Sequence, residues 1–417
     1  MKKKILIIAD SPLVPSGVGT QTRYMIESLL STGEYQFLCL AGAIKHENYN
    51  IQKVEGHEED WTIVPVDGYG NAAIVRGAIK EFKPDVLWFM TDPRFYHWLW
   101  QIEDEIRDKI PMVYYHVWDN YPYPTYNAQY YGSNDLICSI SKVTDDIVKT
   151  VSPDTTSIHI PHAVDTDVFK NTKQLLDSSL RENITDNKPE KLVFFWNNRN
   201  ARRKQSGTLI YWFKEFLDEV GHDSACLLMH TEPKDPHGQD LVAIIEELGL
   251  TNGEVSFSVQ KLPPEDLANI YSVVDCTINI ADAEGFGLST LESLSCETPI
   301  IVNMTGGLQE QVTDGQNWFG IGLEPASRSI IGSQEVPFIY EDRVSKSDFL
   351  NAMRKMFHMT DEERADLGRL GRQHVLNNYS LEIYKQNWIK TFKMIEEKFG
   401  SWESRNNYQS WKLMEVA

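Results

Sequence analysis

The sequence lacks any apolar run of the length that a membrane-spanning helix requires, which is about 18 residues. It is also poor in positive charge, because 40 lysines and arginines stand against 60 aspartates and glutamates and the formal net charge is −20. This deficit disfavours long-range attraction to nucleic acid or to anionic lipid, although it is compatible with a local basic cleft. We therefore expect a protein without a transmembrane segment.

Cysteine is scarce, and its five positions form no Cys-x-x-Cys pair. Most of them lie in apolar runs, as buried free thiols do, which indicates a reducing compartment. No cysteine and histidine cluster suggests a metal site, so we expect no metal and no other cofactor. The start of the chain resembles a signal peptide, but Asp10 ends its apolar run early and no small-residue cleavage site follows. The sequence therefore predicts a cytoplasmic protein that begins with a buried strand at 5–9.

Short apolar runs rich in β-branched and aromatic residues alternate with amphipathic stretches of helical length. Continuous apolar strands separated by helices are typical of parallel sheets that are covered on both faces. The alternation stops in the polar stretch 170–190 and then restarts, and the 417 residues are too many for one core. The sequence predicts an α/β protein with two doubly wound, Rossmann-like domains. The expected parts are a first domain at 1–175, a linker at 176–190, a second domain at 191–375, and a helical tail at 376–417 that packs back on the first domain.

The most informative strand-to-helix loop is 282–292 (DAEGFGLSTLE), which follows an apolar strand and opens a helix. Its glycines let the backbone approach a ligand closely, and the new helix presents free N–H groups to an anion. Glu284 can hold sugar hydroxyls, and Glu292 can accept both hydroxyls of a ribose. An alternative remains for Glu292, because Ser289-Thr-Leu-Glu292 is also a capping-box pattern in which the glutamate bonds back to the helix start.

A basic cluster, 197–204 (NNRNARRK), follows the apolar strand that restarts the alternation, and it places Arg199 and Lys204 five residues apart. Two fixed cations can stabilise the negative charge of a departing nucleoside diphosphate without a metal. A solvated surface run is the usual interpretation of such a cluster. Its position directly after a buried-type strand of an acidic protein favours the functional interpretation.

Together these segments resemble the retaining GT-B glycosyltransferases of the large family 4, also called glycosyl transferases group 1. That family carries Glu-Gly-Phe-Gly and a second Glu eight positions after the first; Ser289 is the main departure, where the family often has Pro. The resemblance implies a GT-B fold, in which two domains face a central cleft, and a diphosphate held by Arg199 and Lys204. The donor contacts that it implies are Glu284, Gly285, Phe286, Gly287, Leu288, Ser289 and Glu292.

The resemblance extends into the first half of the chain through the loop 10–20 (DSPLVPSGVGT). Gly17 and Gly19 match the family's glycine loop, which closes over the phosphates and the sugar, although a plain tight turn is the commoner explanation of Gly-x-Gly. Thr22 stands where a dinucleotide fingerprint needs another glycine, which argues against an NAD enzyme.

His116 ends the apolar strand 112–117, near the point where the family has a histidine whose ring contacts the donor sugar. A core histidine with one satisfied nitrogen is the alternative. The following segment is unusually aromatic, and both sugars and bases stack on such rings, although ordinary packing is equally compatible. The candidates on the acceptor side are Trp118, Asp119, Tyr121, Tyr123 and His162.

The resemblance implies transfer of a glycosyl group from a nucleoside-diphosphate sugar with retention, without a metal, and with a glycan or lipid-linked hydroxyl as acceptor. A hydroxymethylated base of phage DNA is the alternative acceptor, because 116–122 (HVWDNYP) is similar to glycosyltransferases encoded by phages. Two other classes stay open: a GT-B-fold nucleotide-sugar epimerase, which needs no acceptor, and a non-catalytic sugar-binding module. The expected catalytic residues are His116, Arg199, Lys204 and Glu284.

Overall fold

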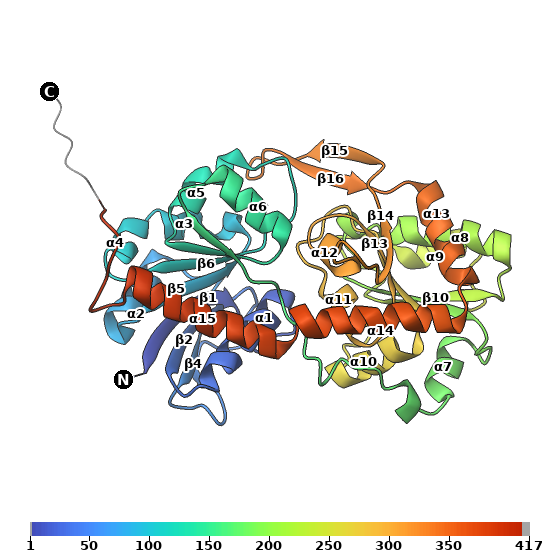
Figure 1. The fold of residues 1–417 in the computed structure, drawn as a ribbon, viewed down its shortest axis with the longest axis horizontal. Coiled ribbons are helices and arrows are strands. Elements are labelled where there is room, and N and C mark those ends of the chain that lie inside the picture. The colour runs from blue at the N-terminus through green and yellow to red at the C-terminus, as the bar shows by residue number, and fades with distance from the viewer. Residues whose placement is uncertain (1, 411–417) are drawn as a thin grey trace. The chain divides into compact units, whose positions relative to one another are not determined.

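The computed structural model describes residues 2–410, which form two compact units. The first unit contains residues up to 163, the short segment 334–337 and the residues from 381 onward, and the second contains 164–333 and 338–380. Each unit is built around its own sheet with helices packed on it (Figure 1). The chain thus has the α/β architecture that the sequence predicts.

The first unit contains an eight-stranded sheet in the order β3-β4-β2-β1-β5-β6-β7-β8, parallel except for the short edge strand β3. Its strands are β1 (Lys3–Asp10), β2 (Tyr35–Gly42), β3 (Gln52–Lys53), β4 (Trp61–Pro65), β5 (Val86–Thr91), β6 (Met112–His116), β7 (Leu136–Ser139) and β8 (Thr156–His159). The residues 5–9 of β1 are buried because helices cover both faces of a parallel sheet. Between β1 and β5 the chain changes the direction in which it adds strands, which makes this pair a topological switch point.

The helices of the first unit are mostly short. They are α1 (Gly17–Leu30), α2 (Ala72–Phe82), α3 (His97–Trp100), α4 (Glu103–Arg107), α5 (Ala128–Gly132), α6 (Lys142–Val151) and α15 (Leu381–Phe399), with 3₁₀ turns η1 (Pro93–Tyr96) and η2 (Thr125–Asn127). The C-terminal helix α15 packs beside α1 (Figure 1). Its Trp388 is fully buried and contacts Trp88 and Tyr115 edge-on, with ring centroids 5.9 and 5.1 Å apart. This aromatic contact anchors α15 on the sheet.

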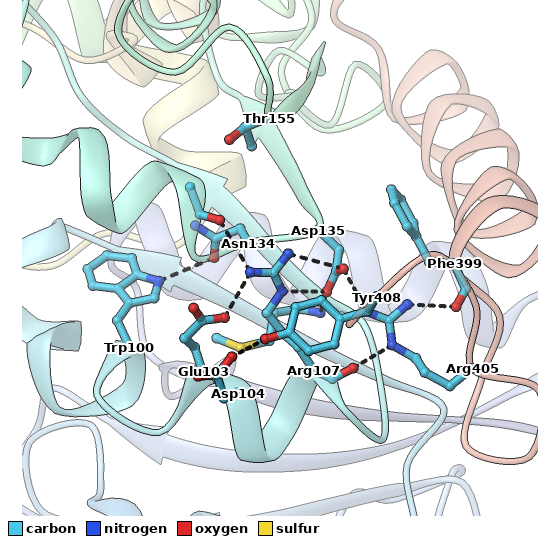
Figure 2. Close-up of polar contacts among 12 residues, drawn as sticks. Trp100, Glu103, Asp104, Arg107, Asn134, Asp135, Thr155, Phe399, Arg405 and Tyr408 are labelled. Carbon is cyan, nitrogen blue, oxygen red and sulfur yellow. Dashed lines mark hydrogen bonds and ion pairs between the residues drawn. The ribbon is translucent and has the colours of Figure 1, made fainter. Parts of the chain in front are cut away.

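After α15 the chain continues along the first unit and is fixed there by Arg405. The guanidinium donates to Asp135 Oδ1 at 2.6 Å and to the Arg107 carbonyl at 2.6 Å. Figure 2 shows these contacts and Tyr408, whose ring lies 4.4 Å from the Arg107 guanidinium carbon. The predicted helical tail therefore ends in a non-helical segment, and its last residues, 411–417, lie outside the described part of the chain.

The second unit contains a six-stranded parallel sheet in the order β11-β10-β9-β12-β13-β14 and a separate antiparallel hairpin. The strands are β9 (Leu192–Asn197), β10 (Ala225–His230), β11 (Val255–Ser258), β12 (Cys276–Asn279), β13 (Ile300–Asn303) and β14 (Gly320–Leu323), with β15 (Ser327–Ile331) and β16 (Ile339–Arg343) in the hairpin. The helices and 3₁₀ turns are η3 (Lys173–Leu175), α7 (Ser179–Ile184), η4 (Arg202–Lys204), α8 (Ser206–Val220), α9 (Leu241–Leu248), α10 (Pro264–Val273), α11 (Leu288–Ser295), α12 (Leu308–Val312), α13 (Lys346–His358) and α14 (Asp361–Asn378).

The core of the second unit lies between this sheet and its covering helices. Helix α8 illustrates why, because five of its apolar residues recur at helical spacing on one face and are fully buried. They are Leu209, Ile210, Phe213, Phe216 and Leu217. Phe216 also meets Phe357 of α13 edge-on at 5.7 Å, so that α13 continues the same apolar layer.

The segment predicted as a linker, 176–190, differs from that expectation, because it belongs to the second unit and contains α7. Arg181 fixes this segment by donating to the carbonyl of Val273 and to Asp275. The chain instead passes from the first unit to the second between Ala163 and Val164. The polar composition that suggested a linker reflects a half-buried polar helix, which is anchored mainly by Arg181.

All five cysteines are buried and free, as their apolar surroundings predict. Within residues 2–410, no helix combines the length and the apolar composition needed to cross a membrane.

Candidate active site

The two loops that the sequence singles out in the second unit begin on neighbouring strands. Strands β9 and β12 pair in parallel, with Phe194 beside Cys276 and Phe195 beside Thr277. Strands β10 and β11 extend the sheet on one side of β9, and β12, β13 and β14 extend it on the other side. The loops after β9 and β12 therefore lie at a topological switch point, where ligands of doubly wound sheets bind.

The loop after β9 is held rigidly before it enters α8. Asn200 is fully buried, accepts a hydrogen bond from the Ser206 hydroxyl at 2.7 Å, and donates to the Gln239 carbonyl at 2.7 Å. Gln205 takes the left-handed conformation, with φ 57°, directly before α8. This turn directs the preceding Lys204 inward instead of into solvent.

Lys204 forms an ion pair with Glu284 of the loop after β12. Their side chains are only 9% and 13% exposed, so the pair is largely withdrawn from water. Asn279, the last residue of β12, also donates to the Glu284 carboxylate, at 3.3 Å. Burial raises the pKa of Glu284, but Lys204 and Arg203 outweigh that effect and leave the pKa below its ordinary value. Glu284 is thus an ionised carboxylate beside a buried ammonium group.

The two loops are joined by three further bonds. Arg203 donates to the Ala283 carbonyl at 2.8 Å, and its own carbonyl accepts the Asp282 N–H at 2.8 Å. Gln205 donates to the Asp282 carboxylate at 2.6 Å. Burial raises the pKa of Asp282 to about 6, although the bond from Gln205 lowers it. These contacts hold the backbone of the two loops in a fixed register around the Lys204–Glu284 pair.

The turn from Gly285 to Gly287 brings backbone very close to backbone. Gly287 has φ 92°, and a side chain there would meet Leu308 at 2.5 Å. A Cβ on Gly307 would lie 2.7 Å from the Cα of Phe286 and 2.8 Å from the carbonyl oxygen of Gly285. The conformation and the contacts of this turn therefore require glycine. Helix α11 starts immediately afterwards, with Leu288 and Ser289 half-buried in its first turn, where helix N–H groups can bind an anion.

The capping interpretation of Glu292 is wrong. Gly287 is the N-cap of α11, no side chain caps the helix, and Ser289 lies inside the first turn. The half-buried Glu292 instead accepts a hydrogen bond from the Tyr271 hydroxyl at 3.0 Å. Tyr271 in turn accepts from Asn197, the last residue of β9, at 2.8 Å. Glu292 is therefore tied to the same edge of the sheet as Lys204 and Glu284.

Arg199 is placed differently from Lys204. Its side chain is 62% exposed and forms a two-point ion pair with Asp235, with N–O distances of 2.7 and 3.2 Å. Arg202 likewise pairs with Glu341 of β16, whose carboxylate also accepts from Arg343. The structure thus brings Lys204 to Glu284 but turns Arg199 and Arg202 toward other carboxylates.

In the first unit, Gly17 and Gly19 belong to the first turn of α1 instead of a free loop. Ser16 caps this helix by accepting the Gly19 N–H at 2.9 Å, and its hydroxyl donates to Asp10 at 2.6 Å. A Cβ on Gly19 would lie 2.7 Å from the carbonyl oxygens of Ser11 and Val14, so this position requires glycine. The turn sits at the switch point beside β1.

His116 is fully buried at the end of β6. Its Nε2 pairs with the Tyr131 hydroxyl at 2.8 Å, whereas Nδ1 has no hydrogen-bond partner within the described residues. Burial lowers the pKa of the ring to about 3, so it is neutral at physiological pH. This arrangement matches the alternative interpretation of His116 as a core histidine with one satisfied nitrogen. A catalytic role for His116 stays a prediction.

The acceptor-side candidates divide into buried and accessible residues. Trp118 and His162 are buried; Trp118 donates to the Asn120 carbonyl, and His162 pairs with Tyr115. Their burial favours a packing role for both side chains, and their assignment to the acceptor side stays a prediction. Tyr123 is exposed, and Asp119 and Tyr121 are half-buried.

Tyr121 and Tyr123 share one polar partner. Both hydroxyls donate to the same oxygen of Asp146, at 2.7 and 3.0 Å, and their rings meet edge-on at 5.2 Å. The two accessible rings therefore form one ordered aromatic surface, which is a suitable shape for stacking against a sugar or a base.

Sequence reasoning missed four residues of the second-unit site. They are Asn279, Tyr271, Arg203 and Gln205. Asn279 had a usable signal, because a polar residue at the carboxyl end of a buried strand commonly faces a ligand site. Tyr271 had no such signal, because the sequence does not distinguish a functional tyrosine inside an apolar helix from a tyrosine of the hydrophobic core. Within residues 2–410, no group of three or more histidine, cysteine, aspartate or glutamate side chains is arranged to hold a metal ion.

Comparisons with known proteins agree with this geometry. Residues 180–374, which contain both loops, match the family model described as glycosyl transferases group 1. The D-inositol 3-phosphate glycosyltransferase of Corynebacterium jeikeium is 26% identical over 186 residues, 44% of this chain and 44% of that enzyme. The chain spans less than half the length of the curated relatives that it matches.

Two solved structures share the fold over nearly the whole chain. The sucrose-phosphate synthase of Thermosynechococcus elongatus has a TM-score of 0.73 at 15% identity, covering 95% of this chain and 100% of that one. The Anabaena protein HepE, solved in complex with UDP and glucose, has a TM-score of 0.68 at 15% identity, covering 94% and 100%. The fold of the chain is therefore GT-B, as its sequence predicts.

Proposed function

We propose that this protein is a glycosyltransferase that uses a nucleoside-diphosphate sugar as donor, because residues 180–374 match the family model described as glycosyl transferases group 1. The observation that carries the proposal is the buried Lys204–Glu284 pair at the β9/β12 switch point, beside the first turn of α11. A buried ammonium group and helix N–H groups suit a diphosphate, and a carboxylate between them suits sugar hydroxyls. Sucrose-phosphate synthase and HepE, which have the same fold, support this assignment.

In the proposed site each residue has a distinct role. Lys204 and the N-terminus of α11 bind the diphosphate, and Arg199 joins them once its guanidinium turns from Asp235 toward the phosphates. Glu284 binds hydroxyls of the donor sugar, and Glu292 binds the ribose. The donor contacts from the backbone come from residues 285–289, where the glycines allow close approach.

We propose that the reaction retains the configuration of the anomeric carbon and needs no metal. The bond between that carbon and the diphosphate oxygen breaks, and the acceptor oxygen forms a bond to the carbon from the same face. The acceptor proton passes to the departing phosphate, whose charge is stabilised by Lys204 and the helix terminus. The proposed acceptor is a hydroxyl of a glycan or lipid-linked sugar; the net charge of −20 disfavours a base of phage DNA.

The proposal is tested by incubating the protein with UDP-, GDP- and ADP-sugars and measuring release of nucleoside diphosphate with and without oligosaccharide acceptors. A glycosyltransferase releases the diphosphate faster when its acceptor is present and yields a product with retained configuration by NMR. Conversion of the donor into an epimer without any acceptor would instead indicate an epimerase. Donor binding without turnover under any condition would indicate a sugar-binding module.

A further inference from the structure

Tyr271 occupies an unusual position for a tyrosine of a packed helix. It is fully buried in α10, and its ring meets Phe195 edge-on at 5.2 Å. Its hydroxyl nevertheless makes two hydrogen bonds, because it accepts one from the Asn197 amide at 2.8 Å and donates one to the Glu292 carboxylate at 3.0 Å. Because the Asn197 amide donates to the Tyr271 oxygen, the hydroxyl proton of Tyr271 points toward the Glu292 carboxylate. The result is a three-residue chain that runs from the end of β9 to α11.

We propose that Tyr271 is a positioning residue that holds the Glu292 carboxylate in the orientation and charge state needed to bind the ribose of the donor nucleotide. This inference rests on the proposed function, in which Glu292 is the ribose ligand. A carboxylate with one oxygen bound to Tyr271 keeps its other oxygen and remaining lone pairs for the two ribose hydroxyls. The fixed chain from Asn197 also lowers the conformational cost of binding, because the glutamate is already ordered.

The charge state matters because the surroundings of Glu292 oppose ionisation. The pKa of Glu292 is raised to about 7, because the effect of burial exceeds that of the Tyr271 hydrogen bond, which lowers it. The titratable groups that interact with it are Tyr271 on α10 and Cys296, the C-cap residue directly after α11. Both remain protonated at neutral pH, because burial raises their own pKa values. The acidity of Glu292 near neutral pH therefore depends on the tyrosine hydroxyl.

The decisive variant is Tyr271→Phe, which keeps the ring and removes only the hydroxyl. UDP, GDP and ADP serve as probes, because all three carry the ribose that Glu292 would bind, and calorimetric titration gives their affinities from pH 5.5 to 8.5. In the unmodified protein we expect the affinity to rise with pH through a midpoint near 7. In Tyr271→Phe we expect about a fivefold loss at pH 7, a midpoint displaced to higher pH, and recovery of much of the loss at pH 8.5.

Three further variants complete the experiment. Glu292→Gln cannot ionise, so it loses about tenfold in affinity and loses the pH dependence. Asn197→Ala leaves Tyr271 and Glu292 in place but frees the hydroxyl to rotate, and it gives a smaller displacement of the midpoint in the same direction. Tyr96→Phe, which removes an equally buried hydroxyl from the first unit, serves as the matched control and leaves affinity and midpoint unchanged.

The outcomes separate this inference from the proposed function. Unchanged affinity and midpoint in both Tyr271→Phe and Asn197→Ala, with a clear loss in Glu292→Gln, would overturn the positioning role and leave the donor site intact. A loss in Tyr271→Phe that is equal at every pH would also overturn it, because that is the result of a purely structural defect. Normal nucleotide binding by Glu292→Gln would overturn the assignment of Glu292 to the ribose.

Discussion

Arg405 donates a 2.6 Å hydrogen bond to Asp135, across a sequence separation of 270 residues. The two side chains are only 9% and 2% exposed. Asp135 also accepts from Arg107 and from the backbone N–H of Met112, at 3.3 and 2.9 Å, so one buried carboxylate joins the tail, α4 and β6 (Figure 2). The Arg405 side chain, near the end of the described residues, is therefore part of the first unit's polar core.

This arrangement predicts unequal costs for removing the two partners. Arg405→Ala leaves Asp135 paired with Arg107, and we expect it to lower the free energy of unfolding by about 1–2 kcal/mol. Asp135→Ala leaves two arginines without their shared carboxylate, and we expect a loss of about 3 kcal/mol or more. Thermal melts and urea titrations of both variants measure the difference. Equal losses, or a larger loss in Arg405→Ala, would contradict the central role of Asp135.

The proposed diphosphate site predicts that Lys204→Ala and Arg199→Ala each lower kcat/KM by about a hundredfold, or about 2.7 kcal/mol in transition-state stabilisation. Release of nucleoside diphosphate measures the effect. Lys214→Ala is the matched control, because Lys214 lies on α8 and pairs with Asp218 one turn away, and it should keep normal turnover. Rates like those of the unmodified protein in both Lys204→Ala and Arg199→Ala would remove the diphosphate assignment.

The proposed mechanism predicts that turnover persists in the presence of EDTA. Lys204 and the N-terminus of α11 supply the positive charge that a divalent cation supplies in metal-dependent enzymes. Rates with EDTA, and then with added magnesium or manganese, give the answer directly. Complete loss with EDTA and recovery with either metal would show that the proposed mechanism is wrong.

Asp282 predicts a pH dependence of stability. Burial raises its folded-state pKa to about 6 from an ordinary value near 4, so the folded protein holds a proton that the unfolded chain releases. Its contribution to the free energy of unfolding is therefore lost as pH rises between these two values. Asp282→Asn can still accept the bond from Gln205, so we expect it to gain on the order of 1–2 kcal/mol relative to the unmodified protein at pH 8 but little at pH 4.5.

Melting temperatures across that range test the prediction for Asp282. Asp314→Asn is the control, because backbone and side-chain bonds from Asn317 lower the pKa of Asp314 to about 2 and its carboxylate stays ionised above pH 4.5. Its effect on the melting temperature should be constant from pH 4.5 to 8. The same constancy in Asp282→Asn would show that Asp282 does not titrate in this range.

Local patterns made much of the fold predictable. The apolar run at 5–9 becomes the buried part of β1, and the run at 192–196 becomes most of β9. A strand that is apolar on both faces is stable only where helices cover both faces of its sheet. The segment 176–190, expected as a linker, contains a helix inside the second unit, because a polar composition does not distinguish an unstructured segment from a half-buried helix such as α7. The anchor at Arg181 is a long-range contact, which no local pattern contains.

By itself the sequence determined that Glu284 and Gly287 lie in a glycine-containing turn between an apolar strand and a helix, because glycine spacing and carboxylate position are local properties of the chain. Only the tertiary structure decided which groups meet. It paired Lys204 with Glu284, turned Arg199 to Asp235, buried His116, and placed Tyr271 against Glu292. The physical reason is the order of the strands: β9 and β12 are far apart in sequence but adjacent in the sheet, so the chemistry of their loops is set by a pairing that arises on folding.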